Sequence, residues 1–314
     1  MKLASFSTSA IPQIRLGLVQ EQEVVDVDLA ARALNLHPYE QMLDLLEHQD
    51  EGMPMLRAIL EKAQGRLFSE VRTFANIGAV HALTHVQLAA PIPRPRKNIL
   101  CLGRNYHDHA VESYQMRGEE RPAGDAPVFF TKATTTINAP YGQIIIDPTV
   151  SEEIDWEVEL AVIIGKAGKN IPETEALSYI FGYTALNDVT ARDLQDKYKQ
   201  FFKGKSLDGY CPLGPWIVTA DELPDPQQLT VRLRVNGVTK QEGSTRDMIY
   251  PVKTIISILS QGMTLEPGDI IATGTPSGIG RARNPPEFLK AGDVMETEID
   301  SIGLLRNEVM NASV

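Results

Sequence analysis

Two glutamates stand two positions apart in a segment that is otherwise suited to burial. The segment DWEVELAVIIG spans residues 155–165, and its glutamates are Glu157 and Glu159. Residues i and i+2 of a strand share a face, so these carboxylates lie about 7 Å apart on one side of the chain. Like charges taken out of water cost several kcal/mol each unless a cation meets them. That face therefore meets Lys or Arg side chains, a metal ion, or solvent.

A third carboxylate follows a second apolar segment. The stretch GYTALNDVTARDLQ, residues 182–195, begins apolar and ends polar, which places Asp188 near the end of a strand. Three carboxylates without a Cys or His companion suit a hard cation such as Mg²⁺ or Mn²⁺ better than zinc or copper. The alternative is a solvated strand face on which Glu157 and Glu159 pair with Lys or Arg.

Composition excludes several classes of partner. The formal net charge of −11 argues against nucleic acid or an anionic membrane, because either usually requires a basic patch. No segment approaches the roughly 20 apolar residues of a spanning helix, and the first residues lack the apolar core of a signal peptide. Cys101 and Cys211 are too few for a disulfide framework or a thiolate metal site. We therefore expect buried free thiols and a cytoplasmic protein.

The pattern of apolar residues predicts an α+β chain that is mainly β. The 314 residues suggest two domains, and the proline-containing segment 89–100 marks the boundary between residues 1–90 and 91–314. The first part reads as a small α/β domain, with two short strands within 14–28 and helical spacing over 39–64. In the second part strands dominate, and helices are predicted at 107–115 and 251–261.

Two nucleotide-binding motifs fail on their context. TGTPSGIG, residues 273–280, follows an apolar strand, as a dinucleotide fingerprint would. The following RARNPPEF contains two prolines where a helix and a βαβ unit are required. Similarly, the GKS at 204–206 lacks the first glycine of a P-loop. The glycines of 273–280 are instead expected to shape a tight, backbone-rich loop.

Six motifs in order resemble the fumarylacetoacetate hydrolase (FAH) superfamily, from about Lys97 to Glu308. They are CLGRNYHDHAVE, DWEVELAVIIG, NDVTARDLQ, GKSLDGYCPLGP, TRDMIYPV and LEPGDIIATGTPSGIG. The resemblance implies an FAH-type mixed β-sandwich roll, a homodimer, and a divalent metal bound by Glu157, Glu159 and Asp188. It also implies action on short 2-oxo acids, including acylpyruvates.

The resemblance further implies a pair of residues that activates water. His109 and Glu112 match this pair, and their spacing of three places them on one helical face. Without the metal motif, an exposed polar pair on a surface helix is the simpler interpretation. His107 lies off that face and is expected to be solvated.

The same resemblance assigns the remaining site residues. Lys205 would stabilise negative charge on a substrate oxygen, with Lys203 as the neighbour that could be mistaken for it. Arg192, Gln195 and Thr275 match substrate-contacting positions. For Arg192 the alternative is a structural ion pair with Asp188 or Asp193.

The sequence departs from the family pattern at two places, both near the expected pocket. Lys132 is followed by Ala133 where many relatives have proline, which leaves the conformation of that loop open. Phe201 and Phe202 stand where a tryptophan is frequent, so the pocket wall and its specificity should differ.

The function expected from these residues is metal-dependent hydrolysis of an acylpyruvate such as fumarylpyruvate. Water attack and C–C cleavage would give pyruvate and a carboxylic acid. Oxaloacetate decarboxylation and 2-hydroxymuconate-type isomerisation use related enolate chemistry and remain alternatives. A different class, a non-catalytic protein that binds a cation such as Ca²⁺ for stability, gives no reason for Lys205, His109 and Glu112 to accompany the carboxylates.

Overall fold

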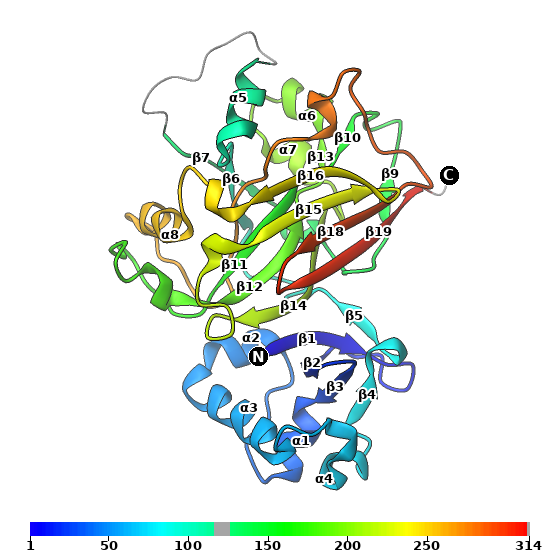
Figure 1. The fold of residues 1–314 in the computed structure, drawn as a ribbon, viewed down its shortest axis with the longest axis vertical. Coiled ribbons are helices and arrows are strands. Elements are labelled where there is room, and N and C mark those ends of the chain that lie inside the picture. Colours follow the sequence, from blue (N-terminus) through cyan, green and yellow to red (C-terminus); the bar gives the residue numbers. More distant parts are fainter. Residues whose placement is uncertain (116–125, 313–314) are drawn as a thin grey trace.

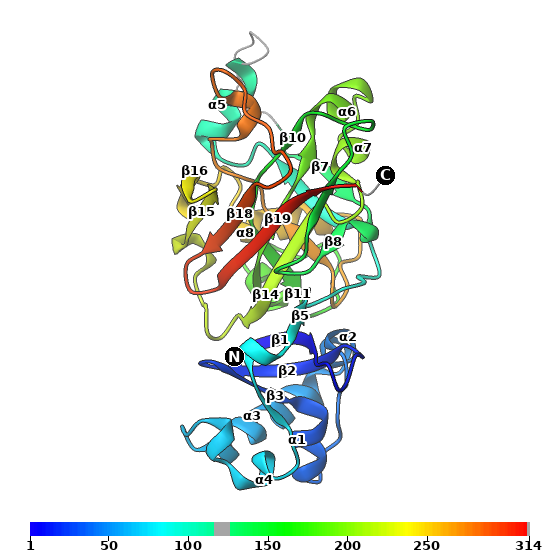
Figure 2. The same cartoon turned by 90° about the vertical axis from the view of Figure 1, so that its right-hand side faces the viewer.

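The computed structural model describes residues 1–115 and 126–312. It is elongated, with residues 1–90 at one end and the remaining strands and helices at the other (Figure 1). A view turned by 90° separates the same two parts (Figure 2). The architecture is α+β and mainly β, as the sequence predicted.

The N-terminal segment, residues 1–90, contains a short antiparallel set of strands covered by helices. The expected pair of strands within 14–28 is present and turns at Glu21, whose φ is +51°. The helical spacing over 39–64 is confirmed and corresponds to two helices. The elements are β1 (Lys2–Ser7), β2 (Arg15–Gln20), β3 (Glu23–Asp26), α1 (Val27–Ala33), α2 (Met42–Glu47), α3 (Gln49–Ala63), η1 (Phe68–Glu70), α4 (Arg72–Ala75), β4 (Val80–Ala82), η2 (Leu83–His85) and β5 (Gln87–Ala89).

A large sheet connects this segment to the rest of the chain. Strand β1 pairs antiparallel with β14, so the strand order runs β4-β3-β2-β1-β14-β12-β11-β17-β6-β7. The domain boundary near residue 90 stays a prediction, since hydrogen bonds of one sheet cross it. The strands beyond the segment are β6 (Ile99–Gly103), β7 (Val128–Lys132), β11 (Val158–Ile164), β12 (Ile180–Asn187), β14 (Cys211–Thr219) and β17 (Ile270–Ala272).

A second sheet packs against the first and completes a sandwich. Its order is β16-β15-β18-β19-β9. The strands are β9 (Ile144–Ile146), β15 (Thr230–Val235), β16 (Val238–Ser244), β18 (Val294–Ile299) and β19 (Gly303–Asn311), with the short β8 (Ile137–Asn138), β10 (Ile154–Asp155) and β13 (Thr190–Ala191) beside the two sheets.

The helices expected at 107–115 and 251–261 are confirmed as α5 (His107–Gln115) and α8 (Val252–Ser260). Short helices follow β13 and precede β14. They are α6 (Arg192–Lys197) and α7 (Phe202–Lys205), and the 3₁₀ turns are η3 (Thr134–Thr136), η4 (Ala176–Tyr179), η5 (Pro226–Gln228), η6 (Thr245–Asp247) and η7 (Gly280–Ala282). Every helix in the described ranges is too short or too polar to cross a lipid bilayer.

Strand β11 is buried on both faces. Val158, Leu160, Val162 and Ile164 pack with residues of the second sheet, as their shared face predicted. Ala161 and Ile163, on the other face, belong to the apolar cluster that includes the N-terminal segment. The burial of this strand fixes the position of the two glutamates at its start. Both cysteines are buried free thiols, as expected.

Candidate active site

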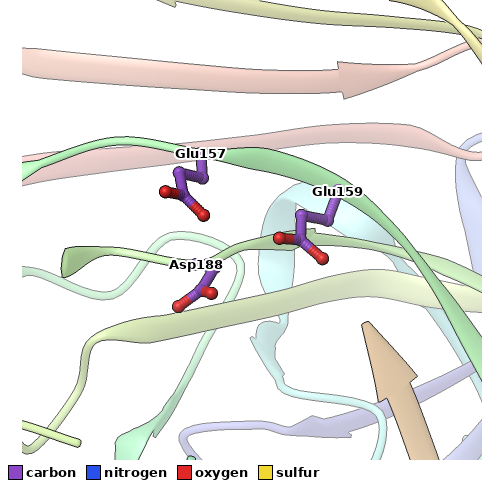
Figure 3. A group of neighbouring side chains, drawn as sticks. All are labelled: Glu157, Glu159 and Asp188. Atoms are coloured by element: carbon purple, nitrogen blue, oxygen red, sulfur yellow. The ribbon is translucent and has the colours of Figure 1, made fainter. Parts of the chain in front are cut away.

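Three carboxylates converge where β11 begins and β12 ends. Oxygens of Glu157, Glu159 and Asp188 lie within 4.8 Å of one another, and Figure 3 shows the side chains turned into the same space. The register of β11 with β12 causes this, because Val158 pairs with Asn187 and Asp188 N donates to the Glu157 carbonyl at 2.8 Å. Glu157 and Glu159 are only 5% and 1% exposed, so the expectation of a solvated face is wrong. The pairing with Lys and Arg that this alternative included is present at Glu157.

Buried cations surround the carboxylates. Lys205, at the end of α7, donates to Glu157 at 2.8 Å and to Asp188 at 2.7 Å. Lys132, the last residue of β7, donates to the other oxygen of Asp188 at 2.6 Å and is fully buried. This contact of Lys132 was not expected from the sequence, where Lys132 matters only as the residue before Ala133. A lone lysine at the end of the apolar strand VFFTK was the available signal.

The charges act differently on the two glutamates. Burial opposes ionisation of Glu157, but Lys205 and Arg192 outweigh it and lower its pKa to about 2. Burial raises the pKa of Glu159 well above its ordinary value, and the negative charges of Asp188 and Glu157 raise it further. The nearby Lys and Arg side chains therefore balance the negative charge of Glu157 but not that of Glu159.

This donor set fits a divalent cation. Buried carboxylate oxygens are ligands that hard cations prefer, and three of them leave further coordination positions for substrate or water. A cation bound beside Glu159 would stabilise the ionised form of this residue, which burial and the neighbouring carboxylates disfavour. Its Oε2 accepts from Gly274 N at 2.7 Å, which fixes the orientation of the carboxylate.

The glycine loop 273–280 supplies this backbone donor. Gly274 has a φ of +96°, and a Cβ there would lie 2.7 Å from the Cβ of Asn105. Only glycine fits that conformation and that space. Asn105 is buried and holds the loop by donating to the Thr273 carbonyl at 2.8 Å. Thr275, the next predicted site residue, is 2% exposed and accepts a hydrogen bond from Gln241 at 2.8 Å.

The structure brings His109 and Glu112 together on α5. His109 Nδ1 lies 3.1 Å from Glu112 Oε2, and His109 is 6% exposed. The other oxygen of Glu112 accepts from Gly278 N at 3.2 Å, so the pair is tied to the glycine loop. The side chain of His107 is 70% exposed, which agrees with the expectation of a solvated residue.

A cavity of about 130 Å³ joins these groups. Phe130 and Phe201 form an apolar part of its wall, with ring centroids 5.4 Å apart. Among the residues predicted from the sequence, the lining includes His109, Glu157, Glu159, Arg192, Gln195, Lys205 and Thr275. Asp188 is buried behind the wall, and Glu112 is linked to the cavity through His109. Lys203 is exposed.

Arg192 forms ion pairs, but with other partners than the sequence suggested. Its Nε donates to Asp155 at 2.8 Å and a terminal nitrogen lies 2.7 Å from Glu157. The expected partners were Asp188 and Asp193. Asp188 is instead held by the two lysines, and Asp193 accepts from Ser151 at 2.6 Å. Burial disfavours the charged guanidinium, yet Asp155 and Glu157 outweigh it and raise the pKa of Arg192.

Sequence reasoning missed three further residues of the site. Asp155 accepts from the backbone nitrogens of Trp156, Gly280 and Arg281, which fixes the position of the loop. Arg281 and Asp196 form an ion pair of 2.6 Å on the cavity wall. Asp155 stands in the DWEVE motif and could have been singled out, but nothing local marks the Arg281–Asp196 pair.

A β-sandwich with three buried carboxylates beside a lysine and a histidine–glutamate pair has the arrangement of a metal-binding enzyme site. Residues 98–310 match the family model described as fumarylacetoacetate (FAA) hydrolase C-terminal. The chain belongs to this family, which confirms the resemblance seen in the six motifs.

Two relatives with similar sequences are named oxaloacetate tautomerases. The chain is 48% identical over 231 residues to an oxaloacetate tautomerase of Bacillus subtilis, covering 73% of this chain and 75% of that protein. It is 39% identical over 312 residues to a mitochondrial oxaloacetate tautomerase of Xenopus laevis. The match covers 99% of this chain and 90% of that protein.

Solved structures resemble the whole chain. A fumarylacetoacetate hydrolase from Exiguobacterium antarcticum has a TM-score of 0.78 at 37% identity, with 99% of this chain and 100% of that one covered. A maleylpyruvate hydrolase from Sphingobium sp. SYK-6, in complex with manganese(II) and pyruvate, has a TM-score of 0.76 at 29% identity, with both chains covered completely.

Proposed function

We propose that this protein interconverts the keto and enol forms of a short 2-oxo diacid such as oxaloacetate, with Mg²⁺ or Mn²⁺ as cofactor. The observation that carries the proposal is that the His109–Glu112 pair and the three carboxylates meet at one small cavity. Two relatives named oxaloacetate tautomerases support it. Hydrolysis of an acylpyruvate, the function expected from the sequence, becomes the second candidate.

The size of the cavity favours a small substrate. Its volume of about 130 Å³ is close to that of cavities that hold one benzene molecule, on the order of 150 Å³. A four-carbon diacid is compatible with this space. A longer acylpyruvate would extend out of this space toward the exposed Asp196 at the mouth of the cavity.

A divalent cation held by Glu157, Glu159 and Asp188 would act as a Lewis acid on the 2-oxo group and make the neighbouring C3 protons more acidic. The residues of the chain then move the proton. His109, oriented by Glu112, takes a proton from C3 as the general base. Lys205 stabilises the negative charge that develops on the 2-oxo oxygen. That oxygen then takes up one proton from solvent while His109 returns the C3 proton to solvent, so that the net change is the transfer of one proton from carbon to oxygen.

Hydrolysis of acylpyruvates is the second candidate, and the same pair of residues favours it. His109 and Glu112 could equally deprotonate a water molecule for attack on a distal carbonyl. The similarity to a maleylpyruvate hydrolase supports this candidate. Oxaloacetate decarboxylation needs no attacking water and would not depend on the pair in the same way.

Three assays distinguish these activities. Purified protein with Mn²⁺ or Mg²⁺ is given oxaloacetate, and the ultraviolet absorbance of the enol is followed together with release of pyruvate. A series of acylpyruvates is assayed in parallel for pyruvate. Tautomerisation predicts metal-dependent change of enol absorbance from oxaloacetate without pyruvate release above the background rate. If pyruvate release from an acylpyruvate is faster than enol turnover of oxaloacetate, the protein is the hydrolase instead. If no 2-oxo acid is turned over in a metal-dependent way, both candidates are refuted.

A further inference from the structure

We propose that Arg281 selects dicarboxylic substrates by binding the carboxylate that is remote from the 2-oxo group. The inference rests on the proposed function, because it assigns a subsite to the same cavity. Arg281 belongs to η7 and lines the cavity together with Glu157 and Glu159. The comparisons and the sequence motifs assign no role to it.

The deeper cations of the cavity are already committed to carboxylates of the protein. Lys205 holds Glu157 and Asp188, and Arg192 holds Asp155 and Glu157. All of these side chains are nearly or fully buried. Moving either cation away from the cluster to reach a remote carboxylate would leave a buried carboxylate of the protein without its partner, which is strongly unfavourable. Lys205 can still stabilise a substrate oxygen at the cluster, because it does not have to move for that.

Arg281 is in a different electrostatic situation. Its partner is Asp196, at 2.6 Å, and the side chains are 33% and 58% exposed. Exposed ion pairs contribute little to stability, because water solvates the separated charges well. A substrate carboxylate can therefore replace Asp196 at small cost, and a guanidinium can hold it with two parallel hydrogen bonds.

The backbone of Arg281 begins beside the carboxylate cluster. One oxygen of Asp155 accepts both Arg281 N at 3.0 Å and Arg192 Nε at 2.8 Å. Arg192 in turn lies 2.7 Å from Glu157. From this position the side chain of Arg281 runs to the exposed Asp196 of α6, at the mouth of the cavity. A short diacid with its 2-oxo acid end at the carboxylate cluster would thus meet Arg281 with its other end.

Replacement of Arg281 by methionine tests the subsite. Exchange of C3 protons for deuterium, followed by NMR, measures enolisation of both oxaloacetate and 2-oxobutyrate, which has a methyl group in place of the remote carboxylate. R281M should raise KM for oxaloacetate about 10–100-fold, the effect of losing a charged hydrogen bond. The kcat should change little, because the contact lies away from the reacting atoms. The KM for 2-oxobutyrate should stay within about two-fold of wild type.

A matched control and a binding measurement accompany this variant. Arg232 has nearly the same exposure, 28%, and an exposed partner, Glu242, on a strand away from the cavity. R232M should leave the preference for the diacid unchanged. Calorimetric titration with oxalate, which has no remote carboxylate of this kind, should give the same affinity for R281M as for wild type when Mn²⁺ is present.

Removal of Asp196 distinguishes substrate binding from a structural ion pair. If Arg281 binds the substrate, D196A frees the guanidinium and leaves the KM for oxaloacetate unchanged or lowers it. If the pair is only structural, D196A reproduces R281M, and this result would overturn the inference. The D196A experiment decides the question even where R281M fails to fold.

Two further outcomes would also contradict the subsite. If R281M raised the KM for oxaloacetate and the KM for 2-oxobutyrate by the same factor, Arg281 would only shape the cavity and would not bind the remote carboxylate. Loss of diacid preference in R104M, with R281M normal, would assign the remote carboxylate to Arg104, the neighbouring arginine of the cavity. Failure of the proposed function is recognised separately, because wild-type protein would then show neither metal-dependent exchange nor metal-dependent oxalate binding.

Discussion

Lys205 donates a 2.7 Å hydrogen bond to Asp188, so the lysine assigned to the substrate contacts one of the residues assigned to the metal. Burial disfavours the charge of Lys205, but Asp188 and Glu157 outweigh it and raise its pKa. The ammonium is therefore a permanent positive charge at the cavity.

We predict that K205M abolishes most turnover and preserves metal binding. Loss of one preorganised charge at a developing oxyanion lowers kcat by about 10²–10³-fold. Affinity for Mn²⁺ should be equal or higher, because a competing cation has been removed from the same oxygens. K203M, two residues away and exposed, serves as the control for both measurements. Wild-type turnover in K205M would exclude the proposed role.

For Glu159 we predict opposite effects on metal binding and on stability. E159Q removes a ligand charge, so Mn²⁺ affinity measured by calorimetry and metal-dependent activity should both fall sharply. The metal-free variant should melt at the same or a higher temperature than wild type, because a buried repulsion is gone. Glutamine can still accept the hydrogen bond from Gly274.

E61Q, an exposed change on α3, provides the control for E159Q. A chelator should abolish wild-type activity, and added Mn²⁺ should restore it. Full Mg²⁺-dependent turnover in E159Q would refute the metal site.

Lys132 should matter for stability more than for chemistry. Its removal leaves part of the buried charge of Asp188 without its partner, so K132M should lower the free energy of unfolding by about 3–5 kcal/mol. Mn²⁺ should recover part of this loss, because it binds the folded state. Urea unfolding with and without the metal measures both effects. K253M, which breaks the exposed pair with Glu173, should change stability by no more than about 1 kcal/mol, and a K132M protein as stable as wild type would contradict the account.

The His109–Glu112 pair should behave as one unit. E112Q should retain Mn²⁺ and oxalate binding, since Glu112 is no ligand, but lose about 10²–10⁴-fold in kcat. H109A should lose a similar amount, and the double variant little more than either single one. Steady-state kinetics on all three variants tests this. Additive losses, or wild-type turnover in E112Q, would make the pair structural.

The local sequence determined the elements that carry the site. Alternation in DWEVELAVIIG placed Glu157 and Glu159 on one side of a buried strand, because side chains of a strand alternate between its faces. The apolar-to-polar change in 182–195 placed Asp188 directly after β12. Helix α5 and the His109–Glu112 contact likewise follow from residues three apart on a helix.

Only the tertiary structure decided which charges meet. Lys132 reaches Asp188 across 56 positions of sequence, and Asp155 reaches Gly280 across 125. Such contacts depend on the strand order that brings β7, β11 and β12 together with the glycine loop. The spacing of residues along the chain does not predict that order. For the same reason the sequence indicated an ion pair for Arg192 but gave the wrong partners, and it left the Arg281–Asp196 pair unseen. Periodicity fixes the direction of a side chain within its own element, whereas its partner is fixed by the packing of elements that are distant in sequence.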